Sequence, residues 1–176
     1  MRMKKRFLAQ AAKFIALFFI ISCNGIVLAD HKAHSNRSFW QAIAGKPINN
    51  RIYLGMWSYH FRKKARHDDD SNNLGVSLVH KGYYAAAFKN SYNDLTISAG
   101  IQRSWCECPI RKNFDFILGY RLGLIYGYDE RMDKTAGRMK VFPYILPFAD
   151  LQYKKVGIEF QTFIYVVTAS FYFNFG

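Results

Sequence analysis

Apolar and polar residues alternate along the last eleven residues of the chain, VVTASFYFNFG. Side chains of a β-strand project alternately to its two faces, so this segment has one apolar and one polar face. The apolar face carries Val167, Ala169, Phe171, Phe173 and Phe175, and the polar face carries Thr168, Ser170, Tyr172 and Asn174. The pattern is typical of the closing strand of an outer-membrane β-barrel, with aromatics toward lipid and polar groups toward the lumen. The alternative is a half-buried strand of a soluble β-sandwich.

Extended patterns recur in eight segments of the chain. They are residues 51–61, 74–81, 83–92, 95–105, 114–128, 139–153, 156–165 and 166–175. Long polar connections (62–73, 106–113 and 129–138) alternate with short turns, as in a barrel with one end facing outside. No apolar run after residue 29 reaches the ~18 residues of a spanning helix. The sequence therefore predicts an all-β fold, an eight-stranded antiparallel outer-membrane β-barrel over residues 51–176.

One predicted strand carries a charge on its polar face. In segment 114–128 the residues Phe116, Leu118, Tyr120, Leu122 and Leu124 share one face, whereas Arg121 lies on the other among glycines. Arg121 would therefore project into the lumen. Since a buried charge needs a partner, we expect it to pair with Asp115 or Glu159.

The N-terminus has the layout of a secretory signal peptide, which we assign to residues 1–29. A basic start, MRMKKR, precedes a largely apolar stretch that ends in VLA before Asp30. A retained membrane anchor and a lipobox ending at Cys23 are the alternatives. The N-terminal segment 30–50 follows, and within it residues 35–44 read as a short amphipathic helix that Gly45 and Pro47 would end. Its Trp40 and Ile43 would lie at a membrane interface or pack against the domain.

The charge balance bears on partners. Removing residues 1–29 takes away five of 25 basic residues and none of the 12 acidic ones, so the mature chain stays positive. Secretion argues against nucleic acid as the partner. Lipopolysaccharide phosphates are the anionic groups at an outer-membrane surface, and Arg and Lys pair well with phosphate; a solvated basic rim is the alternative.

The cysteines and prolines leave alternatives open. After Cys23 is removed, Cys106 and Cys108 remain, either as two free thiols or as a loop disulfide, and no metal or cofactor site is expected.

Pro143 and Pro147 lie four apart in a membrane-length strand, where a proline cannot donate to the ladder. They indicate either a lateral opening between barrel and bilayer or an edge-like distortion near a loop.

Three elements, in order, resemble the lipid A palmitoyltransferase (PagP) family. They are WSYHF at residues 57–61, AFKNSY at residues 87–92, which is similar to the family's A-F-K-D-S-W, and the proline pair Pro143 and Pro147. The resemblance runs from Trp40 to Phe175. It implies a monomeric outer-membrane enzyme that moves an acyl chain from a glycerophospholipid to a hydroxyl of lipid A, the acceptor in lipopolysaccharide.

The resemblance also assigns site residues. His60 would be the base, Ser91 a hydrogen-bonding group or nucleophile, and Pro143 and Pro147 would flank lipid entry. Asn90 stands where the family has Asp, so it orients without adding charge. Three outcomes follow: catalysis through Asn90, a substitute carboxylate from Asp68–Asp70, or loss of catalysis.

Chain-length selection is a second departure from the family. Gly100 matches a family glycine, whereas the position that measures the acyl chain is Gln102, which would shorten the pocket.

Two other functions remain in view. One is a non-catalytic outer-membrane barrel that binds lipid or stabilises the membrane, and the other is a soluble secreted lipid-binding barrel.

Overall fold

The computed structural model of the protein describes residues 39–61, 72–128, 131, 140–163 and 166–176. The elements are α2 (Phe39–Ala44), β1 (Lys46–Pro47), β2 (Arg51–His60), β3 (Asn72–His80), β4 (Tyr83–Lys89), β5 (Leu95–Arg111), β6 (Phe114–Tyr126), β7 (Val141–Tyr153), β8 (Val156–Phe163) and β9 (Val166–Asn174). The signal peptide, the lipobox alternative and the Asp68–Asp70 loop lie outside the described residues.

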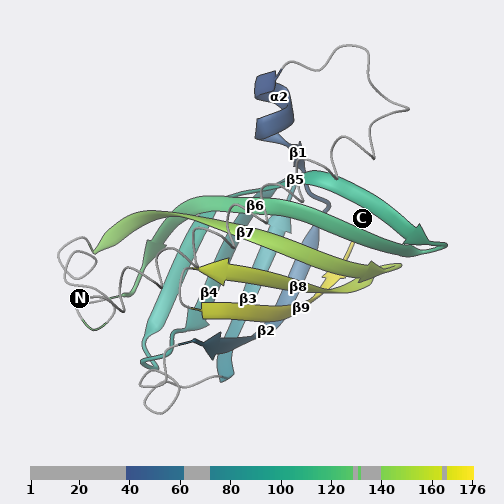
Figure 1. Cartoon of the computed structure of the whole chain (residues 1–176). Coiled ribbons are helices and arrows are strands. Elements are labelled where there is room, and N and C mark those ends of the chain that lie inside the picture. The colour runs from purple at the N-terminus through teal and green to yellow at the C-terminus, as the bar shows by residue number, and fades with distance from the viewer. Residues whose placement is uncertain (1–38, 62–71, 129–130, 132–139, 164–165) are drawn as a thin grey trace, which may run out of the picture. The chain divides into compact units, whose positions relative to one another are not determined.

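Strands β2 to β9 form a closed eight-stranded antiparallel barrel within the unit Ala44–Gly176 (Figure 1). Each strand pairs with the next along the chain, and β2 closes the barrel by pairing with β9, for example Tyr53 with Tyr172. This confirms the predicted fold class. Because the barrel is closed, each of its strands pairs with a neighbour on both sides along at least part of its length, as backbone that faces hydrocarbon requires.

Strand β5 is longer than predicted. It runs to Arg111, so the expected long connection 106–113 is wrong; the link to β6 is the two-residue turn Lys112-Asn113, with Asn113 at φ 67°. Two bulges, between Ser104 and Cys106 and between Pro109 and Arg111, let the pairing with β6 continue. Bulges break the strict alternation on which the boundary was predicted.

The short strand β1 was not predicted from the sequence. Pairing of β5 with β4 stops at Ile101, opposite Tyr83, so the rest of β5 extends beyond β4. Lys46 and Pro47 occupy part of that edge by pairing with Ser104 and Arg103.

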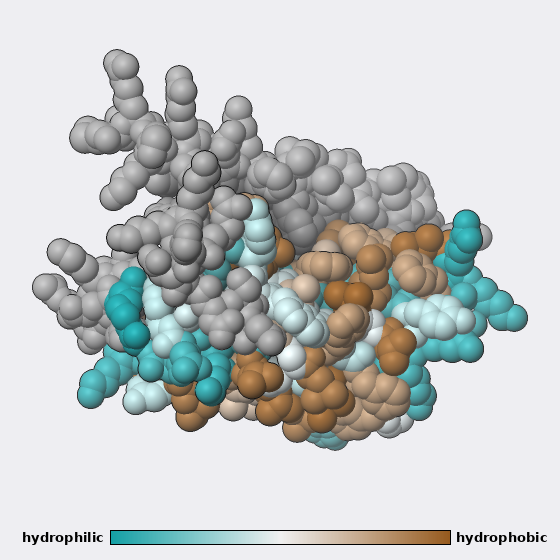
Figure 2. Space-filling model, turned by 90° about the horizontal axis from the view of Figure 1, so that it is seen from below, coloured by the Kyte–Doolittle hydropathy of each residue, from teal (hydrophilic) through white to brown (hydrophobic). Residues whose placement is uncertain are grey.

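The outer face of the barrel is apolar. Exposed large side chains on it include Leu54, Val76, Leu78, Ile97, Leu122, Leu124, Ile145, Phe160 and Phe171. Figure 2 shows this hydrophobic band between hydrophilic ends. In the last strand Phe171 is 51% exposed and Tyr172 only 3%, as the alternation predicted. A closed barrel with this surface fits a β-barrel membrane protein.

The predicted N-terminal helix is present as α2, one and a half turns that end before Gly45. Gly45 has φ 67°, the left-handed conformation common just after a helix end. Trp40 and Ile43 on this helix are exposed. Within the described part of the chain, no helix has the length and apolar character to cross a membrane.

Candidate functional site

His60 and Ser91 meet at the end of the barrel from which the longer connections emerge. His60 is the last residue of β2, and Ser91 lies in the β4–β5 turn; Ser91 Oγ is 3.2 Å from His60 Nε2. The residues are 31 positions apart, and both are partly exposed. A hydroxyl hydrogen-bonded to an imidazole nitrogen is the contact required for proton transfer or for ring positioning. The structure thus brings together two of the three residues proposed as catalytic.

Asn90, the third of these residues, organises the turn that carries Ser91. Its side chain is buried, with 1% exposed. Asn90 Oδ1 accepts hydrogen bonds from the backbone N–H groups of Tyr92 (2.9 Å) and Asp94 (3.1 Å). Asn90 Nδ2 donates to the carbonyl oxygen of Gly127 at 2.9 Å. Both ends of the amide are therefore used to shape the turn and to fasten it to the end of β6.

These contacts give a physical reason for an amide at position 90. The Gly127 carbonyl needs a donor, and an ionised carboxylate has none. A catalytic role for Asn90 itself stays a prediction, since its hydrogen bonds go to the turn and to Gly127.

Charged and aromatic groups also lie next to the same turn. Asp94 forms an ion pair with Arg131, and the Arg131 guanidinium lies 4.7 Å from the centre of the Tyr92 ring. Burial, and to a lesser extent the nearby Tyr92 phenol, raise the pKa of Tyr128 to about 12. Tyr128 therefore keeps its proton at pH values near 10, at which an exposed tyrosine ionises. Sequence reasoning missed these residues, because the contacts join the β4–β5 turn to residues that follow β6.

A cavity of about 130 Å³ lies inside the barrel. Its apolar walls include Met56, Ala86, Phe88, Ile125, Phe142, Tyr144, Leu146, Phe163 and Val166. Val166 is the cross-strand partner of His60, so the cavity reaches the level of the His60–Ser91 pair. Phe88 lies three residues before Ser91. The arrangement suits an apolar chain whose polar end reaches the pair.

Polar residues form the floor of the cavity. Tyr53, Arg121 and Gln161 line it, and beneath them buried ion pairs join Arg121 to Glu159 (2.9 Å) and Arg51 to Asp150 (2.5 Å). The predicted lumenal position of Arg121 and its partner Glu159 are confirmed. The network fills the barrel below the cavity, so the cavity has a closed lower end.

Gln102 belongs to this network rather than to the cavity lining. It is fully buried; its Oε1 accepts from Arg121 Nη2 (2.9 Å), and its Nε2 donates to Tyr53 (2.9 Å) and Glu159 (2.6 Å). Gln102 thus holds Tyr53 and Arg121, two of the residues that form the floor of the cavity. Gly100 lies outside the lining as well. It packs against β6, where an added Cβ would be 2.1 Å from the carbonyl oxygen of Leu122.

Pro143 and Pro147 lie on a stretch of β7 that is paired on one side. Both pair with β6, opposite Leu124 and Tyr120, in a register without a bulge. On the other side, the β7–β8 ladder among the described residues ends at Phe148 opposite Gln161. Proline therefore costs no β7–β8 hydrogen bond here. The alternating residues of the same stretch line the cavity, so its wall borders the end of this ladder.

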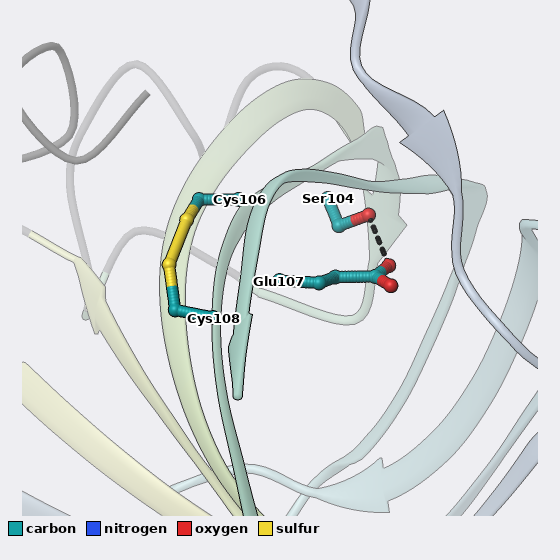
Figure 3. Close-up of a disulfide and its surroundings, with 4 residues drawn as sticks. All are labelled: Ser104, Cys106, Glu107 and Cys108. Atoms are coloured by element: carbon teal, nitrogen blue, oxygen red, sulfur yellow. Dashed lines mark hydrogen bonds between the residues drawn. A yellow bond between two sulfur atoms is a disulfide. The ribbon is translucent and has the colours of Figure 1, made fainter. Parts of the chain in front are cut away.

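Cys106 and Cys108 form a disulfide on the long β5–β6 hairpin. Figure 3 shows the two sulfur atoms on one side of β5 and, on the other, Ser104 Oγ donating to Glu107 Oε1 at 2.8 Å. Of the two alternatives left open by the sequence, the structure has the disulfide. The part of the chain that is described contains no cluster of three or more residues suited to hold a metal.

Comparison with known proteins gives no assignment: no protein-family model matches the chain, and no curated protein matches it. Function is therefore inferred from the site itself and from the resemblance of its motifs.

Proposed function

We propose that the protein is an outer-membrane acyltransferase that moves a fatty acyl chain from a glycerophospholipid to a hydroxyl of lipid A. The observation that carries the proposal is the His60–Ser91 hydrogen bond at the level of an apolar cavity. An apolar outer face supports residence in a membrane, and the pattern of residues 1–29 supports export across the inner membrane.

The chemistry assigned to the pair is general base catalysis. The imidazole of His60 takes the proton of the lipid A hydroxyl as its oxygen attacks the ester carbonyl of the phospholipid. The new ester bond forms, the bond to the glycerol oxygen breaks, and the leaving oxygen takes the proton back from His60. Ser91 positions the imidazole or donates to the developing oxyanion. Neither step needs a metal or a cofactor.

The path of the acyl chain follows from the part of β7 that is not paired with β8 among the described residues. We place entry between β7 and β8, next to Pro143 and Pro147, because their backbone pairing is incomplete in the described part of the chain and the cavity wall adjoins it. The polar floor at Arg121 and Gln161 stops an apolar chain, because burying those groups against hydrocarbon without their partners is unfavourable. Gln102 acts on chain length indirectly, by holding Arg121.

Lipid A profiling tests the proposal. Wild-type protein and His60→Ala are expressed in a host without this activity, and extracted lipid A is analysed by mass spectrometry. We expect one added acyl chain with the wild type and none with the variant. His80 is an exposed histidine at the end of β3, on the opposite end of the barrel from His60. His80→Ala is therefore the matched control and should retain the added chain.

A non-catalytic barrel is the second candidate, and it is favoured by the engagement of Asn90 in the turn, which leaves the pair without a carboxylate from position 90. It predicts unchanged lipid A with correctly folded wild-type protein in the outer membrane. Heat-modifiable migration on gels shows whether the expressed protein has folded, so a folding failure is distinguished from a lack of activity.

A further inference from the structure

Lysines occupy the three two-residue hairpin turns at one end of the barrel. The turns are Lys81-Gly82, Lys112-Asn113 and Lys154-Lys155, which join β3 to β4, β5 to β6 and β7 to β8. Alternate hairpins of an antiparallel barrel lie at the same end, opposite the His60–Ser91 pair. The β5–β6 and β7–β8 hairpins project at the right of Figure 1. All four lysines are exposed; with Arg111, they are called the basic rim below.

Two of these lysines take a backbone conformation that does not favour lysine. Lys81 has φ 52° and Lys154 has φ 54°, in the left-handed region where Gly, Asn and Asp are preferred. In the β5–β6 turn the positive φ, 67°, falls on Asn113, the second residue of the turn, whereas Lys81 and Lys154 are the first residues of theirs. Turn geometry therefore does not explain the lysines, and an uncommon conformation of this kind points to a role for the side chain.

A backbone hydrogen bond holds two of the lysine turns together. The N–H of Lys154 donates to the carbonyl oxygen of Asn113 at 2.9 Å, which holds the β7–β8 turn beside the β5–β6 turn. Lys112, Lys154 and Lys155 therefore belong to adjoining turns. Among the described residues the ion pairs involve Arg51, Arg121 and Arg131, and none involves the rim. Glu107, an exposed acidic residue on the β5–β6 hairpin, accepts a hydrogen bond from Ser104.

Exposed aromatic residues set the depth of the basic rim in a bilayer. Tyr83 is 67% exposed and follows the first turn; Tyr153 is 50% exposed and precedes the third. Lys154 Nζ lies 5.4 Å from the centre of the Tyr153 ring. Aromatic belts of membrane barrels lie at the headgroup level. Lysines directly beyond such a belt are at the depth of the lipid phosphates.

We propose that the basic rim binds the phosphate headgroups of anionic glycerophospholipids in the leaflet at the short-turn end. The proposal requires that the barrel lie in a bilayer, but it does not require acyl transfer. Charge complementarity, the depth set by Tyr83 and Tyr153, and the conformations of Lys81 and Lys154 carry it. Binding there would hold the barrel at a fixed height, with the His60–Ser91 pair at the opposite surface.

Lipid selectivity measured by electron paramagnetic resonance tests the proposal. The folded protein is reconstituted in phosphatidylcholine vesicles that contain spin-labelled phosphatidylglycerol or spin-labelled phosphatidylcholine, and the motionally restricted fractions are compared. We expect phosphatidylglycerol to be favoured several-fold, since one lysine near an anionic group contributes roughly a fivefold effect. The variant Lys112→Gln/Lys154→Asn/Lys155→Gln should bring the ratio close to one. Lys140 precedes β7 at the end of the barrel opposite the basic rim. Lys140→Gln is therefore the control and should leave the ratio unchanged.

Two further measurements keep the test decisive. Lys154→Asn alone suits the left-handed conformation, so it should fold at least as well as the wild type and still lower the selectivity. Equal association of both labelled lipids with the wild type, or full selectivity in the triple variant, would overturn the proposal. It would also be overturned if inorganic phosphate, but not chloride at equal ionic strength, abolished the selectivity, because the rim would then be a site for free phosphate.

Discussion

Replacing Asn90 by Asp separates two roles for this position. The motif resemblance assigns a catalytic carboxylate here, whereas the structure gives the amide a donor bond to the Gly127 carbonyl. The substitution keeps the size of the side chain and the acceptor that serves Tyr92 and Asp94. It removes the donor and adds a negative charge to a buried site.

The cost follows from these contacts. The Gly127 carbonyl loses its close donor and keeps only the Thr96 hydroxyl, at 3.5 Å. A fully buried, unsatisfied polar group costs about 1–3 kcal/mol, and the cost at this partly buried carbonyl lies toward the lower value. The two backbone N–H groups bind a carboxylate more strongly than an amide, which offsets part of the cost of burying the charge. Asp94 in the same turn adds like-charge repulsion. We expect the free energy of unfolding to fall by about 1–3 kcal/mol.

Two assays measure the effect of Asn90→Asp. Urea unfolding in detergent micelles gives the change in stability, and lipid A mass spectrometry gives acyl transfer, which should decrease as Ser91 loses its fixed position. Asn93→Asp is the matched control, because it adds the same charge to an exposed position of the same turn and leaves the Gly127 bond intact. A rise in acyl transfer with Asn90→Asp would refute the reasoning, since the carboxylate would then act as the resemblance implies.

Three other predictions concern the barrel interior. Glu159→Gln removes the carboxylate shared by Arg51 and Arg121, and it should lower the free energy of unfolding in urea titrations by about 3–5 kcal/mol; an unchanged midpoint would contradict the assigned pairing. Ser98→Leu adds a branched side chain to the cavity wall, so mass spectrometry of lipid A should show shorter added chains, whereas an unchanged chain length would place the acyl site elsewhere. The raised pKa of Tyr128 means that folding favours the neutral phenol. The stability that this phenol contributes is therefore present below pH 10 and is lost as the pH rises toward 12. Tyr128→Phe should therefore lose less stability than the wild type over that range, and equal losses would argue against the burial of the phenol.

The strands could be predicted because the two faces of this barrel differ in chemistry. Period-two alternation places Phe171 outside and Tyr172 inside, and the same rule placed Arg121 in the lumen. The end of β5 could not be predicted in this way, since its two bulges interrupt the alternation and Pro109 resembles a loop residue. The extra strand β1 depends on the length of β5, so it was missed for the same reason.

The site was only partly predictable from the chain. His60 and Ser91 were selected through motif resemblance, and their contact across 31 residues depends on strand register. The role of Asn90 depends on Gly127, a carbonyl 37 residues away that carries no side-chain signal. Gln102 was expected at the end of the acyl pocket, but its fully buried amide acts on the floor through Arg121.

Acyl transfer by purified protein is the most direct test of the proposed function. Folded protein in detergent is mixed with lipid A and a phospholipid that carries a radiolabelled sn-1 chain, and the label on lipid A is measured over time. We expect label to accumulate on lipid A with the wild type and not with His60→Ala. Absence of labelled lipid A with folded wild-type protein, or equal labelling by the variant, would contradict it.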